Sequence, residues 1–315
     1  MPIIVGGRIS GGRIFSLSGG ASSPVVGFQG SVSGYTSGGF SPAISYTRTI
    51  DKFSFASDAN ATNVGLFTQG RYVVAGQSST VSGYSSGGST FPASNVIDKF
   101  PFATNANATN VGVLTQSRSS AAGQSSTASG YTSGGCPTVN TIDKFPFASD
   151  ANATNVGSLT QSRFGVAGQS STISGYSSGG SSSNVIDKFP FSSDANATSV
   201  GILSVTRCWS AGQSSTVSGY TSGGNSAGGP VSGTIRNTID KFPFSSDANA
   251  TNVGALTQGR QTVAGQSSTA SGYSSGGFAP GTSNVIDKFP FASDANATNV
   301  GSLITARQGP AGQQI

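Results

Sequence analysis

One motif occurs six times along the chain, and its spacing limits the possible folds more than any other feature. Each copy contains Gly-Tyr-Ser/Thr-Ser-Gly-Gly followed, after a loop, by Ile-Asp-Lys-Phe. The tyrosines of successive copies are 49, 47, 45, 44 and 53 residues apart: Tyr35, Tyr84, Tyr131, Tyr176, Tyr220 and Tyr273. A sequence period in the forties is typical of propeller blades and of repeat arrays. The repeat therefore predicts one closed domain of six similar units.

Each unit reads as four short strands. A small-residue strand, Gln-Ser-Ser-Thr, precedes a second strand that ends near Ser-Gly-Tyr-x-Ser. Ile-Asp-Lys-Phe-Pro-Phe forms the third strand, and its proline belongs at the strand end because proline cannot donate to a ladder. Val-Gly-x-Leu-Thr forms the fourth strand, which ends at an arginine. The pattern predicts an all-β, six-bladed β-propeller of four-stranded antiparallel blades, with the paired phenylalanines packing between blades.

The chain ends determine how such a ring closes. Gly312 and Gln313 repeat the start of a blade, but the segment near Val26 already supplies that piece in the first unit. We therefore expect the N-terminal strand near Val26 to complete the first blade and so close the ring.

The first 25 residues lie outside the repeat. They predict an extended N-terminal arm at 1–25 and a propeller at 26–315. Short apolar and basic groups in the arm suit docking on a neighbouring subunit, and the alternative is a flexible tail. The candidate anchoring residues are Ile3, Ile4, Arg8, Arg13 and Phe15.

The loop between the second and third strands varies most in length. It is shortest at 181–183 and longest at 225–237. Variable loops on a constant scaffold are where binding residues are usually found. The candidate binding residues there are Phe40, Tyr46, Phe91, Arg236 and Phe278, and the alternative for each is packing on the blade rim.

Charge and hydropathy exclude two classes of partner. The chain has 16 basic and 11 acidic residues, a net charge of +5. This excess is too small and too scattered for a nucleic-acid surface. No apolar run approaches the ~18 residues that a membrane-spanning helix needs. We expect neither a nucleic-acid partner nor a membrane span.

Catalysis has few candidate groups. The chain has no histidine, and all of its acidic residues are aspartates. Imidazole and glutamate are therefore missing as acid–base groups. Asp51 and Lys52 recur in every unit, so we expect them to pair blades rather than to react. We predict no enzyme activity, no catalytic residue, no cofactor and no metal site.

A second recurring run, Asp58-Ala-Asn60-Ala-Thr62, spaces oxygen side chains at alternate positions. Calcium loops begin in this way, but this run lacks their sixth-position glycine and closing glutamate. We interpret it as an Asx-type turn between the third and fourth strands. Its Asn-Ala-Thr sequon would carry a glycan only in a secreted eukaryotic protein.

The repeat resembles the kelch repeat, which pairs a tyrosine before Gly-Gly with a later strand of the form Val-Glu-x-Tyr and an arginine. The matching residues in the second unit are Tyr84, Gly87, Gly88, Ile97, Asp98, Phe100 and Arg118. The resemblance covers about residues 26–315. It departs at the usual fourth-strand tryptophan, because valines such as Val111 stand in that region.

The longer phrase, Phe-x-Phe-Ala-Ser-Asp-x-Asn-Ala-Thr-x-Val-Gly-x-Leu-Thr with Gly-Gln-Ser-Ser, is similar to kelch-like proteins of tailed phages, especially cyanobacterial ones. That resemblance implies a non-catalytic structural or adhesive virion component of the head or tail surface, a fibre or a decoration protein. Such a protein is made in the host cytoplasm and belongs to a larger assembly. Its arm would bind other virion proteins, and its loops would bind a host glycan or protein.

Two alternatives to a virion component stay open. The first is a cellular carbohydrate- or protein-binding propeller. The second is a propeller enzyme of the oxidase or sialidase kind, which the missing histidine and glutamate oppose.

Overall fold

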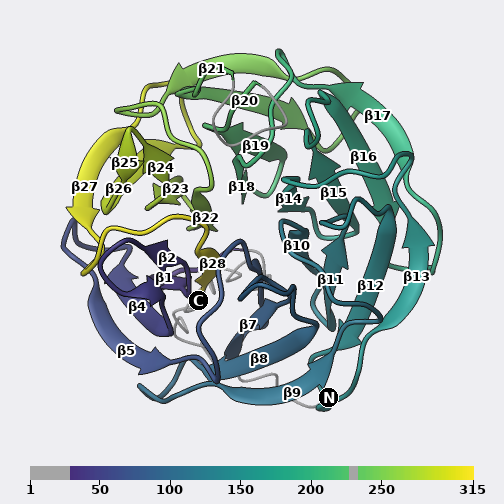
Figure 1. Cartoon of the computed structure of the whole chain (residues 1–315). Helices are drawn as coiled ribbons and strands as arrows, with labels where there is room; N and C mark the ends of the chain where they lie inside the picture. The colour runs from purple at the N-terminus through teal and green to yellow at the C-terminus, as the bar shows by residue number, and fades with distance from the viewer. Residues whose placement is uncertain (1–28, 227–232) are drawn as a thin grey trace, which may run out of the picture.

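Six four-stranded antiparallel sheets surround a central axis and form a closed ring (Figure 1). The computed structural model describes residues 29–226 and 233–315. Every regular element within these ranges is a β-strand. The predicted all-β, six-bladed propeller with four-stranded blades is confirmed. The predicted arm at 1–25, with Ile3, Ile4, Arg8, Arg13 and Phe15, lies outside the described residues.

The strands of each blade run outward from the axis in chain order, except in blade 1. Blade 1 contains β28 (Ala311–Gln314), β1 (Ser33–Ser37), β4 (Thr49–Ser54) and β5 (Thr62–Leu66). Blade 2 contains β6 (Ala75–Ser78), β7 (Ser82–Ser86), β8 (Val96–Pro101) and β9 (Thr109–Val113). Blade 3 contains β10 (Ala122–Ser125), β11 (Ser129–Ser133), β12 (Thr141–Pro146) and β13 (Thr154–Ser158).

The other three blades follow the same pattern. Blade 4 contains β14 (Ala167–Ser170), β15 (Ser174–Ser178), β16 (Val185–Pro190) and β17 (Thr198–Ile202). Blade 5 contains β18 (Ala211–Ser214), β19 (Ser218–Ser222), β20 (Thr238–Pro243) and β21 (Thr251–Ala255). Blade 6 contains β22 (Ala264–Ser267), β23 (Ser271–Ser275), β26 (Val285–Pro290) and β27 (Thr298–Ser302). Two short hairpins add β2 (Phe40–Ser41) with β3 (Ser45–Tyr46), and β24 (Phe278–Ala279) with β25 (Gly281–Thr282).

The local sequence accounts for most strand limits. The third strand ends at its proline in blades 2 to 6, as predicted. The fourth strand begins two residues before the predicted valine, because Thr109 already pairs with Lys99. It ends at Val113, before Leu114, whose side chain is buried in the core. The inner strand likewise begins earlier than predicted, at Ala-Gly-Gln-Ser.

The ring closes through the C-terminal strand β28, so the prediction that the segment near Val26 completes the first blade was wrong. β28 pairs antiparallel with β1 and is the innermost strand of blade 1. The first described residues contact blade 6 instead. Gly30 forms a bridge with Ser268, and the Gln29 side-chain amide donates to the Ser268 carbonyl oxygen at 3.2 Å.

The inner strands approach one another closely at a glycine. A Cβ at Gly168 would lie 2.2 Å from the Gly123 carbonyl oxygen, and one at Gly312 would lie 2.1 Å from that of Gly265. The same contact joins all six inner strands at Gly76, Gly123, Gly168, Gly212, Gly265 and Gly312. Glycine is required where backbones approach this closely. Both chain ends supply this glycine, but only the C-terminal segment follows it with the glutamine of every other inner strand. Gln313 donates to the Tyr84 carbonyl oxygen of blade 2 at 3.0 Å, whereas Phe28 follows Gly27.

Aromatic side chains fill each interface between blades. The Tyr35 ring of blade 1 lies 5.6 Å from the Phe100 ring and 4.8 Å from the Phe102 ring of blade 2, centroid to centroid. Ile50 and Phe67 pack in the same cluster. Equivalent clusters fill the other five interfaces. Burial of one such ring contributes about 2 kcal/mol, and the predicted packing of phenylalanine pairs between blades is confirmed.

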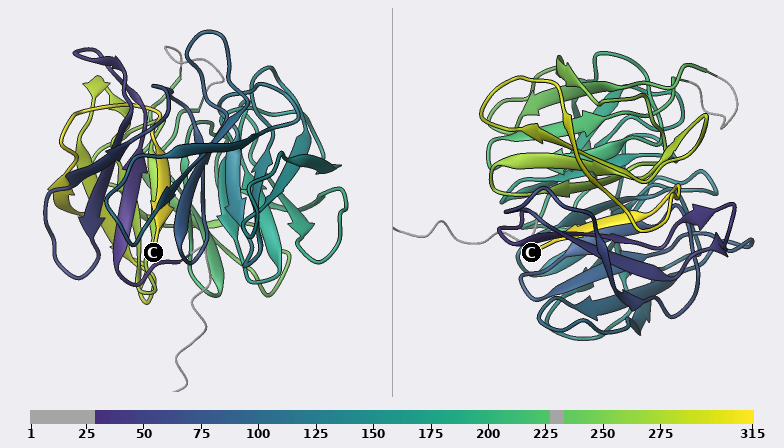
Figure 2. Two further views of the ribbon diagram at one scale, coloured as in Figure 1. Left: turned by 90° about the horizontal axis from the view of Figure 1, so that it is seen from below. Right: turned by 90° about the vertical axis from the view of Figure 1, so that its left-hand side faces the viewer.

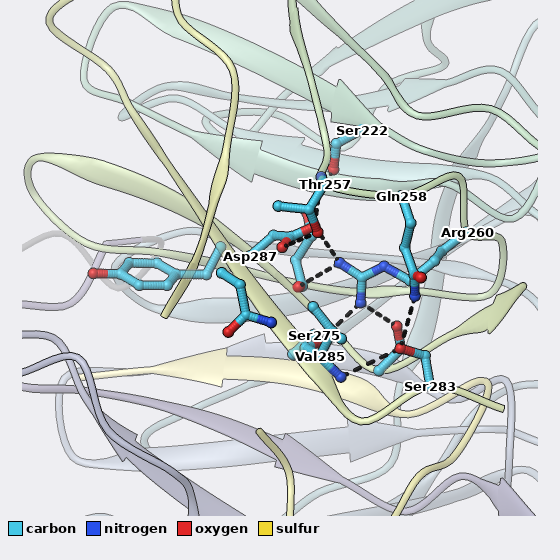
Figure 3. Close-up of polar contacts among 12 residues, drawn as sticks. Ser222, Thr257, Gln258, Arg260, Ser275, Ser283, Val285 and Asp287 are labelled. Atoms are coloured by element: carbon cyan, nitrogen blue, oxygen red, sulfur yellow. Dashed lines mark hydrogen bonds and ion pairs between the residues drawn. The ribbon is translucent and has the colours of Figure 1, made fainter. Parts of the chain in front are cut away.

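A buried ion pair also joins each blade to the next (Figure 3). Arg260, in the linker after blade 5, lies 2.7 Å from Asp287 of blade 6, and both side chains are fully buried. Burial lowers the pKa of Arg260, an effect that the Asp287 carboxylate opposes. The equivalent pairs are Arg71–Asp98, Arg118–Asp143, Arg163–Asp187, Arg207–Asp240 and Arg307–Asp51. The predicted role of Asp51 and its counterparts in pairing blades is confirmed.

The two faces of the propeller differ (Figure 2). We call one the loop face, because it holds the loops between second and third strands and the linkers from each fourth strand to the next blade. The opposite face holds the tight turns between first and second strands and the Asp-Ala-Asn-Ala-Thr turns. In the left view of Figure 2, the hairpin of residues 40–46 lies on the loop face, and the C-terminus lies on the opposite face.

Candidate functional site

The six blades differ most clearly in a segment of constant length on the loop face. Three residues separate the buried arginine from Ala-Gly-Gln in every blade. These triplets are Tyr-Val-Val, Ser-Ser-Ala, Phe-Gly-Val, Cys-Trp-Ser, Gln-Thr-Val and Gln-Gly-Pro, beginning at residues 72, 119, 164, 208, 261 and 308. No two are alike, although the residues on both sides are the same in all six.

The middle residues of the triplets form a closed ring of backbone hydrogen bonds around the axis. Each donates its N–H to the carbonyl oxygen of its counterpart in the preceding linker, at 2.6–2.9 Å. The members of this backbone ring are Val73, Ser120, Gly165, Trp209, Thr262 and Gly309. All six have positive φ, between 48° and 67°. That conformation is strained for β-branched residues such as Val73 and Thr262.

A cavity of about 560 Å³ lies on the loop face around this ring. Residues of all six linkers line it, together with the second-to-third-strand loops of blades 2 and 3. Its fourteen lining residues are Tyr72, Val73, Ser89, Phe91, Ala93, Ser119, Ser120, Cys136, Pro137, Phe164, Trp209, Gln261, Thr262 and Gln308. The volume falls within the usual range of small-molecule sites, roughly 300–1,000 Å³.

Two aromatic pairs form much of the cavity wall. The ring centroids of Tyr72 and Phe91 are 6.2 Å apart, and those of Phe164 and Trp209 are 5.9 Å apart. Gly165 leaves room for the indole, because a Cβ there would lie 3.0 Å from Trp209 Cδ1. The glycine of one linker and the tryptophan of the next are therefore sterically matched.

The five residues predicted from loop length have different positions. Phe91 lies in the cavity wall and is 74% exposed. Phe40 and Tyr46 pair across the β2–β3 hairpin and contact Tyr72, at 6.2 and 5.6 Å between centroids, so they extend the aromatic cluster outward. Arg236 and Phe278 are half-buried and do not line the cavity.

Sequence reasoning missed Tyr72, Phe164 and Trp209. These residues stand in linkers whose length never changes, and loop length was the signal followed. The signal that finds them is the difference between otherwise identical repeats at the two positions after the arginine.

The aspartates of the chain form ion pairs. Six pair with the buried arginines, and the other five pair with lysines on the rim of the opposite face. These account for all 11 acidic residues of the sequence. An aspartate that acted as an acid or base would therefore have to leave a contact that joins two blades.

The calcium-like run serves as a contact between blades. Asp58 Oδ1 lies 3.1 Å from Lys288 Nζ, and the Asn60 side-chain oxygen accepts from the Ser302 N–H at 3.0 Å. Within the part of the chain that the structure describes, no three His, Cys, Asp or Glu side chains are grouped to hold a metal ion.

The two cysteines lie in different surroundings. Cys136 is exposed in the cavity wall, whereas Cys208 is buried. Burial raises the pKa of the Cys208 thiol to about 11, so it stays protonated at neutral pH. A thiol reagent acting on the folded protein would therefore report on the cavity through Cys136.

Comparison with protein-family models and with curated proteins finds no match for this chain. The fold is that of a six-bladed propeller and is compatible with a kelch-like one and with a binding or adhesive role. Across residues 29–226 and 233–315, no helix has the length and hydropathy needed to cross a membrane.

Proposed function

We propose that this chain is a non-catalytic binding propeller whose ligand site is the loop-face cavity. One observation carries the proposal: the linkers, whose three residues differ in every blade, all contribute to one cavity with aromatic walls. Aromatic side chains and a few polar groups in a concave site are the usual composition of a binding pocket.

The absence of catalysis is part of the proposal. Two observations support it: the sequence has neither histidine nor glutamate, and its aspartates are engaged in ion pairs. A panel of glycosidase, esterase and oxidase substrates should give no turnover above buffer. Turnover that Trp209→Ala abolishes would contradict the proposal.

We further propose that the protein is an adhesive or structural component of a virus particle, as the similarity of its repeat to phage kelch-like proteins implies. The two faces suit such a role. Gln29, the first described residue, contacts the face opposite the cavity, so the preceding arm would anchor that face to other virion proteins. Exposed apolar side chains surround the axis on the same face: Val32, Val81, Ile173 and Val217.

Binding to intact particles and to host cells tests this assignment. Antibodies against the protein should label purified virions, and the soluble protein should bind host cells. Trp209→Ala should weaken cell binding and leave assembly into particles unchanged. Val81→Asp combined with Val217→Asp should do the reverse. Failure to label virions, together with failure to bind host cells, would refute the virion role.

The cellular alternative makes a different prediction. A carbohydrate- or protein-binding propeller of cellular origin would bind a cell-surface ligand through Trp209 and be missing from particles. The same labelling experiment separates the two, and a gene neighbourhood of virion genes or of cellular genes gives an independent check.

A further inference from the structure

The cavity wall is uncharged. None of the fourteen described residues that line it is Asp, Lys or Arg. An anionic ligand that entered would lose its hydration without gaining a partner of opposite charge, which is unfavourable. The wall therefore favours a neutral ligand over an anionic one.

The aromatic pairs provide flat apolar surfaces on different blades. Tyr72 comes from the linker after blade 1 and Phe91 from a loop of blade 2, with 34° between their ring planes. Phe164 and Trp209 come from the linkers after blades 3 and 4, with 50° between their planes. Rigid rings give a large contact area at little cost in conformational entropy. A ligand with a flat apolar face fits such walls.

Small polar side chains complete the wall. Ser119, Ser120, Thr262 and Gln308 line the cavity and are half-buried. The amide groups of the backbone ring below are already bonded to one another. Hydroxyl and amide side chains, rather than open backbone, are therefore what the cavity offers. An extended peptide that binds by strand addition needs open backbone groups to pair with.

A hexopyranose matches this composition. Its C–H faces are apolar and flat enough to stack on an aromatic ring, and its hydroxyls lie at the edge, where side-chain hydroxyls and amides can bond to them. We propose that the cavity binds a neutral hexopyranose unit of a surface glycan, stacked on Trp209 and in contact with Phe91, with its hydroxyls toward Ser119, Ser120 and Thr262. This inference rests on the proposed binding function and gives it a ligand class.

The test begins with an array of glycans that carry neutral, sialylated or sulfated hexoses. Neutral hits are then titrated by calorimetry against the intact protein. Trp209→Ala and Phe91→Ala should each weaken binding by about five- to tenfold, as expected for the loss of one aromatic contact. Phe91 is largely exposed, so its variant tests the site even if Trp209→Ala folds poorly. Phe278→Ala, an aromatic outside the cavity, is the matched control and should bind as the parent protein does.

A second readout uses the thiol in the wall. N-ethylmaleimide should modify Cys136, and a saturating neutral glycan should slow that modification several-fold, because the ligand covers the cavity. The buried Cys208 should stay unmodified throughout.

The outcomes separate this inference from the function beneath it. Binding only to sialylated or sulfated glycans, or equal binding by Trp209→Ala and the parent, would overturn the neutral-sugar site. If a proline-rich peptide or choline slows the modification of Cys136 and no glycan binds, the ligand class is wrong, but the protein is still a binding propeller. If the protein binds neither glycans nor host cells, the proposed function is wrong as well.

Discussion

Replacement of Asp287 by asparagine removes one charge of a buried pair and leaves Arg260 in place. The carboxylate accepts from Arg260 Nη2 at 2.7 Å, from the Thr257 hydroxyl at 2.7 Å and from the Thr257 N–H at 3.1 Å. Asparagine has nearly the same shape, and its amide nitrogen can donate to the Thr257 hydroxyl, which accepts as well as donates. The variant therefore keeps these hydrogen bonds but leaves an uncompensated buried cation.

The expected loss of stability follows from that geometry. Removal of one partner of a buried ion pair costs about 3–5 kcal/mol. Arg260 keeps its hydrogen bonds to the carbonyl oxygens of Gly276 at 2.6 Å and Val285 at 2.9 Å, which favours the lower end of this range. We expect Asp287→Asn to reduce the free energy of unfolding by about 3 kcal/mol.

Asp58→Asn is the matched control. It makes the same chemical change in the pair with Lys288, which lies beside Asp287 on β26. The Asp58 side chain is 58% exposed and lies 3.1 Å from the lysine nitrogen. Exposed pairs contribute about 0–1 kcal/mol, so this variant should unfold almost as the parent does.

Urea unfolding measures both variants, with circular dichroism and the fluorescence of Trp209, the one tryptophan in the sequence, as independent probes. Arg260→Met alone and combined with Asp287→Asn completes a double-mutant cycle. The double variant should lose less stability than the sum of the singles, by about 2 kcal/mol or more. An Asp287→Asn effect below about 1 kcal/mol, or additive singles, would refute the view that this pair fastens blade 6 to the preceding linker.

Three further predictions concern the rim, the axis and the blade interfaces. Asn105 stands where the other blades have the aspartate that pairs with a lysine, so Asn105→Asp should form an ion pair with Lys52. In urea titrations the free energy of unfolding should rise by about 0.5 kcal/mol at low salt, and about 1 M salt should remove this gain. Gly168→Ala would place a Cβ 2.2 Å from the Gly123 carbonyl oxygen and should lower the melting temperature through a cost of about 1–3 kcal/mol, whereas an unchanged melting temperature would contradict the packing at the axis. Burial raises three tyrosine pKa values from about 10 to about 12, so the folded state holds protons that the unfolded state releases, and the urea midpoint should fall as pH rises through this interval. These residues are Tyr35, Tyr176 and Tyr273.

The fold was predictable because the packing repeats. Tyr84, Ile97 and Phe100 recur at the same spacing in every unit, and each fills the same place in its blade interface. One copy therefore fixes the environment of the other five. The closing strand was not fixed in this way, because both chain ends resemble the start of a blade. What separates the ends is the residue after the glycine: the Gln313 side chain donates to the Tyr84 carbonyl oxygen and the Ser85 hydroxyl of the neighbouring blade, whereas Phe28 stands at that position of the N-terminal segment.

The candidate site was harder to predict because nothing in its packing repeats. Five different residue types occupy the six positions of the backbone ring, from glycine at 165 to tryptophan at 209, and the ring hydrogen bonds form in every case. The backbone of the linkers therefore keeps one conformation with all five of these side chains. Val73 and Thr262 even keep positive φ, which β-branched residues adopt at a cost. Three of the four aromatic rings around the uncharged cavity stand in these linkers, at Tyr72, Phe164 and Trp209. The proposed ligand site rests on this difference between repeats, which loop length does not reveal.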